Sequence, residues 1–220
     1  MLVSLLVAAC VRSQVALTAA DGRCASLASW QACYPRRVVR CYSDRDLALA
    51  VRGTRWQRVW PTLRPVERAD VWRYLHVWRH GGVYADSDAY CVRPLPARAL
   101  VVGIEARPPS EEAEAARVHI RYPAQYAQWV FAAAAPRHPA LKAVLDDIYA
   151  AWLRGGPHTT LNFTGPGAFT RALLPLWPPD RALPQEAFAC NGYGGAPGLC
   201  QSSGVLVRHS FAGSWKHEMR

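Results

Sequence analysis

Residues 64–88 read RPVERADVWRYLHVWRHGGVYADSD, and this stretch decides the fold. Its apolar side chains recur at three-residue steps, at Ala69, Trp72, Leu75 and Trp78. That spacing is typical of one buried face of an α-helix. Pro65 suits the first turn of such a helix, where its missing N–H costs nothing. Gly81 and Gly82 end the helix, because glycine adopts left-handed backbone angles without strain.

A short strand and two aspartates follow the glycines. Val83 to Ala85 leaves room for only a short strand, and Asp86 and Asp88 stand at its carboxyl end. Alternate residues of an extended segment point the same way, so both carboxylates can face one ion. Hard oxygen ligands suit Mg²⁺ or Mn²⁺, and open α/β sheets bind ligands beyond the carboxyl ends of their strands. The pattern predicts a metal site; the alternative is a solvated turn.

Asp70 and Arg73 lie three residues apart on the predicted helix and therefore share a face. Such a pair can be a plain surface contact worth a few tenths of a kcal/mol. Here, however, Trp72 and Tyr74 surround the pair with apolar surface. This setting favours a pocket in which the arginine holds a phosphate or a sugar hydroxyl.

The rest of the chain predicts alternating strands and helices, which favours an α/β architecture. In order, we expect a helix at 25–33, a strand at 38–42, a helix at 46–51 behind a Ser43-Asp44 cap, helices at 126–131 and 141–153, a turn-rich loop at 162–167 leading into a helix at 169–174, and a last strand at 204–207.

The composition fits one folded domain. The chain has 220 residues, of which 51% are hydrophobic, enough for a sizeable core. Its formal net charge of +10 comes almost entirely from arginine, since lysine occurs only at Lys142 and Lys216. The arginines are scattered, and no RNP, zinc-finger or basic-helix motif is present. We therefore expect no nucleic-acid partner, although the charge would suit an anionic nucleotide or a membrane surface.

The N-terminus and the cysteines bear on the compartment. The apolar run from Leu2 to Val11 is too short to span a bilayer. We set residues 1–20 apart as a signal, the remains of an anchor or a first core strand, and take 21–220 as the domain. None of the cysteines forms a C-x-x-C pair. Cys190 and Cys200 could close a disulfide, which would indicate a secretory compartment; buried free thiols are the alternative.

The motifs around the aspartates resemble the sugar-binding region of glycosyltransferase family 32. The resemblance is carried by Arg68-x-Asp70-x-x-Arg73-Tyr74 and by Gly81-Gly82-Val83-Tyr84-x-Asp86-x-Asp88. Further motifs in the same order are Ser29-Trp30, Tyr34-Pro35, Tyr42-Ser43-Asp44, Gln128-Trp129-Val130-Phe131, His138-Pro139, Thr164-Gly165-Pro166, and His209 with Gly213-Ser214-Trp215. The resemblance covers about residues 25 to 216. The family includes the initiating α-1,6-mannosyltransferases of Golgi outer-chain synthesis and sphingolipid mannosyltransferases.

The resemblance implies a single GT-A-like α/β domain with a mixed central sheet flanked by helices. It implies a metal-dependent, retaining transferase that moves a hexose, mannose being favoured, from a GDP- or UDP-hexose to a glycan or glycolipid acceptor. It also implies a place in the Golgi or secretory pathway, with association with a membrane. A same-face attack, in which the leaving phosphate accepts the acceptor's proton, is the implied mechanism.

The resemblance also assigns roles to residues. Asp86, Asp88 and His209 would hold Mn²⁺ or Mg²⁺, and Asp70, Arg73 and Asp88 would be catalytic. The nucleotide-sugar would contact Tyr84, Gly81, Gly82, Gly165, Ser214 and Trp215.

One segment departs from the family pattern. Members begin with a strand of the type Ile-Pro-x-Ile-Ile-His-Gln, whereas Val15 to Thr18 occupies that place without the Pro, His or Gln. The alternative function is therefore a catalytically inactive module of the same fold that binds a nucleotide-sugar or a partner. A phosphohydrolase of the haloacid dehalogenase type fits less well, because Ala89 and Tyr90 follow the second aspartate.

Overall fold

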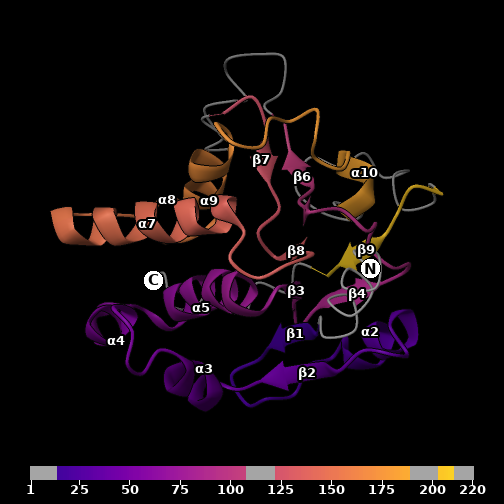
Figure 1. The fold of residues 1–220 in the computed structure, drawn as a ribbon, viewed down its shortest axis with the longest axis horizontal. Coiled ribbons are helices and arrows are strands. Elements are labelled where there is room, and N and C mark those ends of the chain that lie inside the picture. The colour runs from indigo at the N-terminus through magenta and orange to yellow at the C-terminus, as the bar shows by residue number, and fades with distance from the viewer. Residues whose placement is uncertain (1–13, 108–121, 189–202, 211–220) are drawn as a thin grey trace, which may run out of the picture.

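The computed structural model describes residues 14–107, 122–188 and 203–210, and these form an α/β fold around a mixed sheet (Figure 1). In the described residues the central sheet has the order β2-β1-β3-β8-β5. Its strands are β1 (Val15–Thr18), β2 (Val39–Tyr42), β3 (Gly82–Asp86), β5 (Leu100–Val101) and β8 (Val130–Ala133). β1 pairs in parallel with β2 and β3, and β8 pairs antiparallel with β3 and β5. The predicted mixed α/β sheet is confirmed.

Helices and short ribbons cover both faces of the sheet. The helices are α2 (Leu27–Cys33), α3 (Asp44–Ala50), α4 (Trp56–Val59), a 3-10 turn η1 (Trp60–Thr62), α5 (Pro65–His80), α7 (Pro139–Arg154), α8 (Thr160–Phe163), α9 (Pro166–Leu173) and α10 (Gln185–Phe188). Antiparallel ribbons pair β4 (Ala89–Cys91) with β9 (Val207–His209) and β6 (Ile104–Ala106) with β7 (Gln125–Tyr126).

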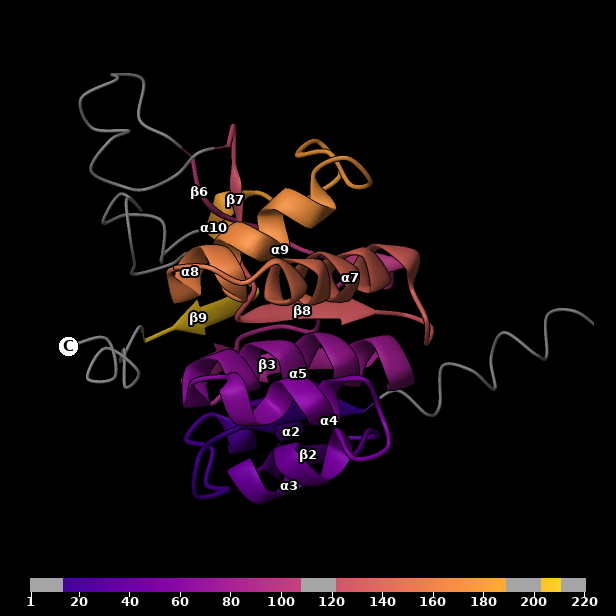
Figure 2. The ribbon, with the colours of Figure 1, turned by 90° about the vertical axis from the view of Figure 1, so that its left-hand side faces the viewer.

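The strands divide the core because successive side chains point to opposite faces. Tyr84 and Phe131 join one apolar cluster with α5, α7 and α9, the face turned toward the viewer in Figure 2. Val83 and Val130 join a second cluster with α2, α10 and the β4–β9 ribbon. The sheet is therefore buried on both sides.

The helix and turn predicted from residues 64–88 are confirmed. Pro65 is the first residue of α5, and Gly81 and Gly82 follow its end with φ of 66° and 88°. A Cβ at Gly82 would lie 2.3 Å from the carbonyl oxygen of Gln14, so a side chain has no room there. The Ser43 cap is confirmed as well, in a capping box with Asp46 at the start of α3.

The helix predicted at 126–131 is wrong. Residues 125–126 form β7 and residues 130–133 form β8, and Trp129 to Ala133 are all buried. A short run that is mostly apolar shows neither the helical nor the strand period, so its sequence fits a buried strand and a buried helix equally well. The last strand also begins later than predicted, at Val207 rather than Gly204.

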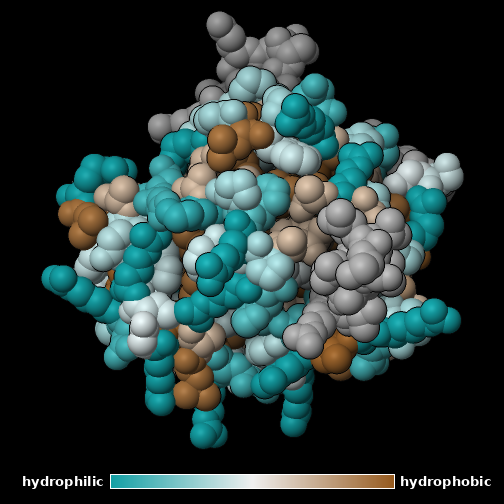
Figure 3. Space-filling view, in the orientation of Figure 1, coloured by the Kyte–Doolittle hydropathy of each residue, from teal (hydrophilic) through white to brown (hydrophobic). Residues whose placement is uncertain are grey.

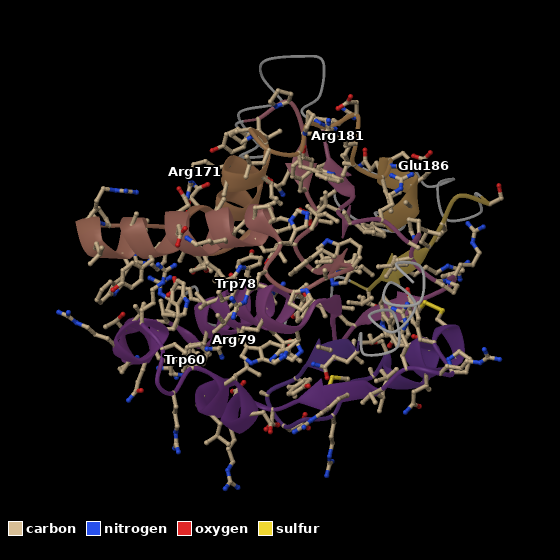
Figure 4. The ribbon with its side chains drawn as sticks, viewed as in Figure 1. Trp60, Trp78, Arg79, Arg171, Arg181 and Glu186 are labelled. Atoms are coloured by element: carbon tan, nitrogen blue, oxygen red, sulfur yellow. A yellow bond between two sulfur atoms is a disulfide. The ribbon has the colours of Figure 1, made fainter. Side chains whose placement is uncertain are left out.

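Disulfides join Cys24 to Cys41 and Cys33 to Cys91, and their bonds are yellow in Figure 4. They tie α2 and the residues before it to β2 and β4. The sequence motifs gave no sign of these pairings, since spacing alone does not fix connectivity. The pair Cys190 and Cys200 lies outside the described residues.

None of the helices in 14–107, 122–188 and 203–210 has the length and apolar character that crossing a bilayer requires. On the face shown in Figure 3, hydrophobic side chains lie in small separate groups among hydrophilic ones. Of the segment 1–20, the part from Val15 to Thr18 is β1, which lies inside the central sheet. Residues 1–13 lie outside the described residues.

Candidate active site

The site forms where β3 ends and α5 begins. The chain turns back at Gly81 and Gly82, so the N-terminal half of α5 lies beside the carboxyl end of β3. This brings Asp70 and Arg73 of α5 to Asp86, the last residue of β3. An Arg73 guanidinium nitrogen lies 3.1 Å from Asp70 Oδ1, and another lies 3.1 Å from Asp86 Oδ1.

The Asp70–Arg73 pair is buried, with side chains 1% and 6% exposed. Thr164 Oγ1 donates to Asp70 Oδ2 at 2.8 Å, and Arg73 donates to the Gln128 carbonyl at 3.2 Å. Burial raises the pKa of Asp70 above its ordinary value, against the lowering effect of Arg73. Burial lowers and Asp86 raises the pKa of Arg73, and the net change is a rise. Arg73 therefore stays charged between the two carboxylates.

Tyr84 holds Oδ1 of Asp86, the oxygen that also pairs with Arg73. Its hydroxyl donates to Asp86 Oδ1 at 2.6 Å and lies 2.8 Å from Thr18 Oγ1. Burial raises the pKa of Tyr84 well above its ordinary value, so the hydroxyl keeps its proton. The Arg73 guanidinium lies 4.7 Å from the centre of the Tyr84 ring. Arg73 and Tyr84 thus both hold Oδ1 of Asp86, and Oδ2 faces His209.

Asp86, Asp88 and His209 form a cluster that could hold a metal ion, with one ligand atom from each lying within 4.8 Å of the others. His209 Nε2 lies 3.1 Å from Asp88 Oδ1 and 3.9 Å from Asp86 Oδ2. The pairing of β9 with β4 places His209 opposite Ala89, next to the aspartates. Carboxylate oxygens suit Mg²⁺ and Mn²⁺ alike, and an imidazole ligand favours Mn²⁺. The residues present therefore fit such an ion.

The His209 ring rests on a support that our sequence-based prediction missed. It stacks on Trp129 with centroids 4.3 Å apart and planes at 16°. Trp129 Nε1 donates to Glu105 Oε1 at 3.1 Å, and Gln125 donates to Glu105 Oε2 at 2.7 Å. Burial raises the pKa of Glu105. Glu105 is the one charged residue in the apolar run 100–106. A single charge in a run that resembles a buried strand is the sequence feature by which Glu105 could have been predicted as a site residue.

The other predicted contacts fall in three places. Gly165 precedes α9 and follows Thr164, so it lies beside Asp70. Gly81 and Gly82 lie before and at the amino end of β3, whereas Asp86 ends that strand, and the substrate-binding role of the two glycines stays a prediction. The positive φ angles of both glycines form the turn between α5 and β3, and Gly82 lets the backbone pass close to Gln14. Ser214 and Trp215 lie outside the described residues.

Parts of this chain are similar to known glycosyltransferases. The family model described as the glycosyltransferase sugar-binding region containing the DXD motif matches residues 14–107. An initiation-specific alpha-1,6-mannosyltransferase of Schizosaccharomyces pombe is 29% identical over 196 residues, 70% of this chain and 48% of that protein. HOC1 of Saccharomyces cerevisiae, assigned as a glycosyltransferase, is 31% identical over 107 residues, 43% of this chain and 26% of that protein.

Among solved structures, the PaToxG glycosyltransferase aligns with a TM-score of 0.49 at 13% identity, over 78% of this chain and 74% of that one. The chain spans about half the length of the S. pombe relative and about a quarter of the S. cerevisiae one. The matched region begins just before β1 and includes α5, β3 and both aspartates. Residues 14–107 of this chain thus match the glycosyltransferase sugar-binding region that contains the DXD motif, and the curated relatives that the chain resembles carry the names of glycosyltransferases.

Proposed function

We propose that this chain is a metal-dependent, retaining glycosyltransferase that moves a hexose, mannose being favoured, from a GDP- or UDP-sugar to a glycan or glycolipid acceptor. The observation that carries the proposal is the meeting of Asp86, Asp88 and His209 at the carboxyl end of β3. Ligands of α/β sheets bind at that edge. The name of the S. pombe relative, an initiation-specific alpha-1,6-mannosyltransferase, supports mannose.

The proposed chemistry needs charge stabilisation on the leaving diphosphate. A divalent cation, Mn²⁺ or Mg²⁺, supplies it as a Lewis acid when bound. Asp88 and His209 would hold it together with Oδ2 of Asp86, whose Oδ1 is already occupied by Arg73 and Tyr84. Because those donors are fixed before substrate arrives, Asp86 needs no reorganisation during the reaction.

We propose that transfer takes place on one face of the sugar. The bond between the anomeric carbon and the diphosphate oxygen breaks, and its electron pair leaves with the diphosphate. The acceptor oxygen forms the new bond from the same side and gives its proton to the leaving phosphate. Asp70 and Arg73 are buried, which supports a positioning role: Arg73 holds Asp86, and Asp70 holds Thr164. Contact of this pair with the sugar stays a prediction.

We also propose that the chain works in the secretory pathway, in the Golgi and in association with a membrane. The disulfides Cys24–Cys41 and Cys33–Cys91 support an oxidising compartment, since cytosolic thiols are kept reduced.

The test is nucleotide-sugar turnover by the wild type and by Asp88→Asn, which keeps the shape of the side chain and removes its charge. With Mn²⁺, hydrolysis or transfer should be seen for at least one GDP- or UDP-hexose. It should fall at least about a hundredfold in Asp88→Asn, the scale of losing a key electrostatic group. Asp180→Asn is the matched control, because Asp180 is exposed and far along the chain from the cluster.

Full activity of Asp88→Asn, with its metal requirement unchanged, would contradict the proposal. Metal-dependent binding of the nucleotide-sugar without any turnover would instead identify the chain as the inactive module of the same fold.

A further inference from the structure

A hollow lies apart from the metal cluster, at the C-terminal end of α7. It encloses about 720 Å³, within the range of small-ligand sites. Its walls include Thr62, Trp152, Arg154, His158, Asn162 and Phe163. These residues come from the 3-10 turn before α5, from the end of α7, from the loop that follows and from α8.

The hollow adjoins the active site along α5. Thr160 Oγ1 donates to Glu67 Oε1 at 3.0 Å, and Thr164 Oγ1 donates to Asp70 Oδ2 at 2.8 Å. Glu67 and Asp70 are three residues apart and share a face of α5. Residues 162–163, which line the hollow, lie between these two anchors. The hollow and the Asp70 end of the site are thus separated by a single short segment.

The two sites also lie on the same side of the molecule (Figure 2). β3 ends at Asp86, and α5 begins at that edge because it runs back against β3. In Figure 2 α8 and β9 both lie toward the left of the ribbon, and Figure 1 shows them apart across its width. His158 lines the hollow, and its Nε2 lies 3.3 Å from Oε1 of Glu67 on α5. A chain molecule bound at Asp86 and Asp88 could therefore reach the hollow along this edge.

The chemistry of the walls suits a carbohydrate. Trp152 lines the hollow and donates its Nε1–H to Thr62 Oγ1 at 3.0 Å, so the ring is held in place. Sugars place their C–H face on such rings, and their hydroxyls need donors and acceptors around the rim. Arg154 and Asn162 are exposed on this rim, and within the described part of the chain Arg154 makes no ion pair.

A second arginine in the lining, Arg171, is already neutralised. Arg171, labelled in Figure 4, lines the hollow from α9, and its guanidinium pairs with Asp147 of α7. No aspartate or glutamate is among the described residues that line the hollow. The walls thus offer an aromatic ring, polar groups and, among the described residues, one arginine without an ion pair, Arg154, and this mixture suits the hydroxyl groups of a sugar.

We propose that this hollow is an acceptor subsite, which binds the sugar residues of a glycan acceptor that lie beyond the reacting hydroxyl. The proposal rests on the transferase function proposed above. It assigns Trp152 as the stacking platform and Arg154 and Asn162 as hydrogen-bonding partners. It predicts that the protein prefers long acceptors to short ones, because only a long glycan spans both sites.

The test compares kcat/KM for a high-mannose oligosaccharide with kcat/KM for a mannose disaccharide. The ratio of the two is the readout, because a loss of folded protein lowers both values equally. The wild type should favour the oligosaccharide, and Trp152→Ala should lower the ratio about tenfold, the equivalent of one lost stacking contact. Arg154→Ala should lower it less, and Trp152→Phe, which keeps an aromatic face, should retain most of it.

Leu153→Ala is the matched control on the same helix turn, since Leu153 is 64% exposed and does not line the hollow. Its ratio should equal that of the wild type. An unchanged ratio in both Trp152→Ala and Arg154→Ala, or a wild type that does not distinguish the two acceptors, would overturn the subsite.

If the protein transfers to no acceptor, the proposed function is contradicted. The subsite can still be tested by binding. In that case the binding of the same oligosaccharide is measured by titration calorimetry. Weaker binding by Trp152→Ala than by Leu153→Ala upholds the subsite, and equal binding overturns it.

Discussion

At the scale of single residues, Asp86 is the point on which the site depends. Its Oδ1 accepts from Tyr84 at 2.6 Å and pairs with Arg73 at 3.1 Å, while Oδ2 faces His209. Asp70 lies beyond Arg73 and is itself held by Thr164. The aspartate spacing predicted that Asp86 and Asp88 meet, but not that Oδ1 of Asp86 is held by Arg73 and Tyr84, because these two side chains come from different elements.

Removing Arg73 should destabilise the fold. In Arg73→Met, the carboxylate of Asp70 stays buried without its cation, which costs about 3–5 kcal/mol. The free energy of unfolding in urea measures this loss. Arg45→Met, on the exposed side of α3, should change it by no more than about 0.5 kcal/mol. Equal stabilities of the two variants would contradict the buried ion pair.

Glu105 should act as a positioning residue for His209 through Trp129. In Glu105→Gln, one of the donors from Gln125 and Trp129 loses its carboxylate partner, and the indole under His209 is less well held. Outer partners of metal ligands typically change metal affinity by about 10–100-fold. We therefore expect the Kd for Mn²⁺ to rise about tenfold, measured by titration calorimetry.

The matched control is Glu186→Gln, on α10 and labelled in Figure 4. Its Kd for Mn²⁺ should equal that of the wild type. A Glu105→Gln variant with wild-type Mn²⁺ affinity would show that Trp129 holds its place without the carboxylate.

At the scale of elements, α5 and β3 could be predicted from the sequence, β9 was predicted three residues too early, and β7 and β8 were predicted as a helix. The apolar stripe of α5 predicts a helix, and Pro65 and Gly81 mark where that helix begins and ends. The fully buried run around β8 has no polar side to reveal a period. His209 reaches the aspartates only through the pairing of β9 with β4, a contact across more than a hundred residues that no local pattern contains.

The packing of α5 on β2 should make stability depend on pH. His76 of α5 is buried between aromatic rings. Its ring centre lies 4.4 Å from that of Trp72 and 5.1 Å from that of Tyr42 in β2. Burial lowers the pKa of His76 from 6.5 to about 3. The unfolded chain then takes up a proton below pH 6.5 that the folded chain does not, so stability is present above that pH and falls as the pH drops toward 3.

Between pH 7 and 5.5 the loss should be about 1 kcal/mol. His76→Gln can keep a hydrogen bond to Gln14, the partner at 2.9 Å in the wild type, and cannot titrate. Its free energy of unfolding should therefore fall less steeply over this range than that of the wild type. Parallel pH profiles for the two proteins would show that His76 is not the group responsible.

At the scale of the whole molecule, the disulfides fasten the N-terminal half of the fold. The Cys33–Cys91 bridge spans 58 residues and links α2 to the strand that follows the aspartates, and Cys24–Cys41 spans 17. The chain-entropy estimate is about 4 kcal/mol for the longer loop and about 3 kcal/mol for the shorter one. The sequence could not reveal these pairings, because several connectivities were equally compatible with it.

Replacing Cys33 and Cys91 by serine should therefore lower the free energy of unfolding more than replacing Cys24 and Cys41 does. Denaturant unfolding under non-reducing conditions measures both. A wild-type protein whose unfolding midpoint is unaffected by a strong reductant would show that the bridges do not stabilise the fold.

The central claim is that Asp86, Asp88 and His209 bind a metal ion that in turn binds a nucleotide-sugar diphosphate. The most direct measurement is titration calorimetry of GDP and UDP into the wild type and Asp88→Asn, each with and without Mn²⁺. We expect the wild type to bind one of the nucleotides only when Mn²⁺ is present, and Asp88→Asn to lose that binding. Nucleotide affinity that is the same with and without Mn²⁺, in both proteins, would contradict the claim.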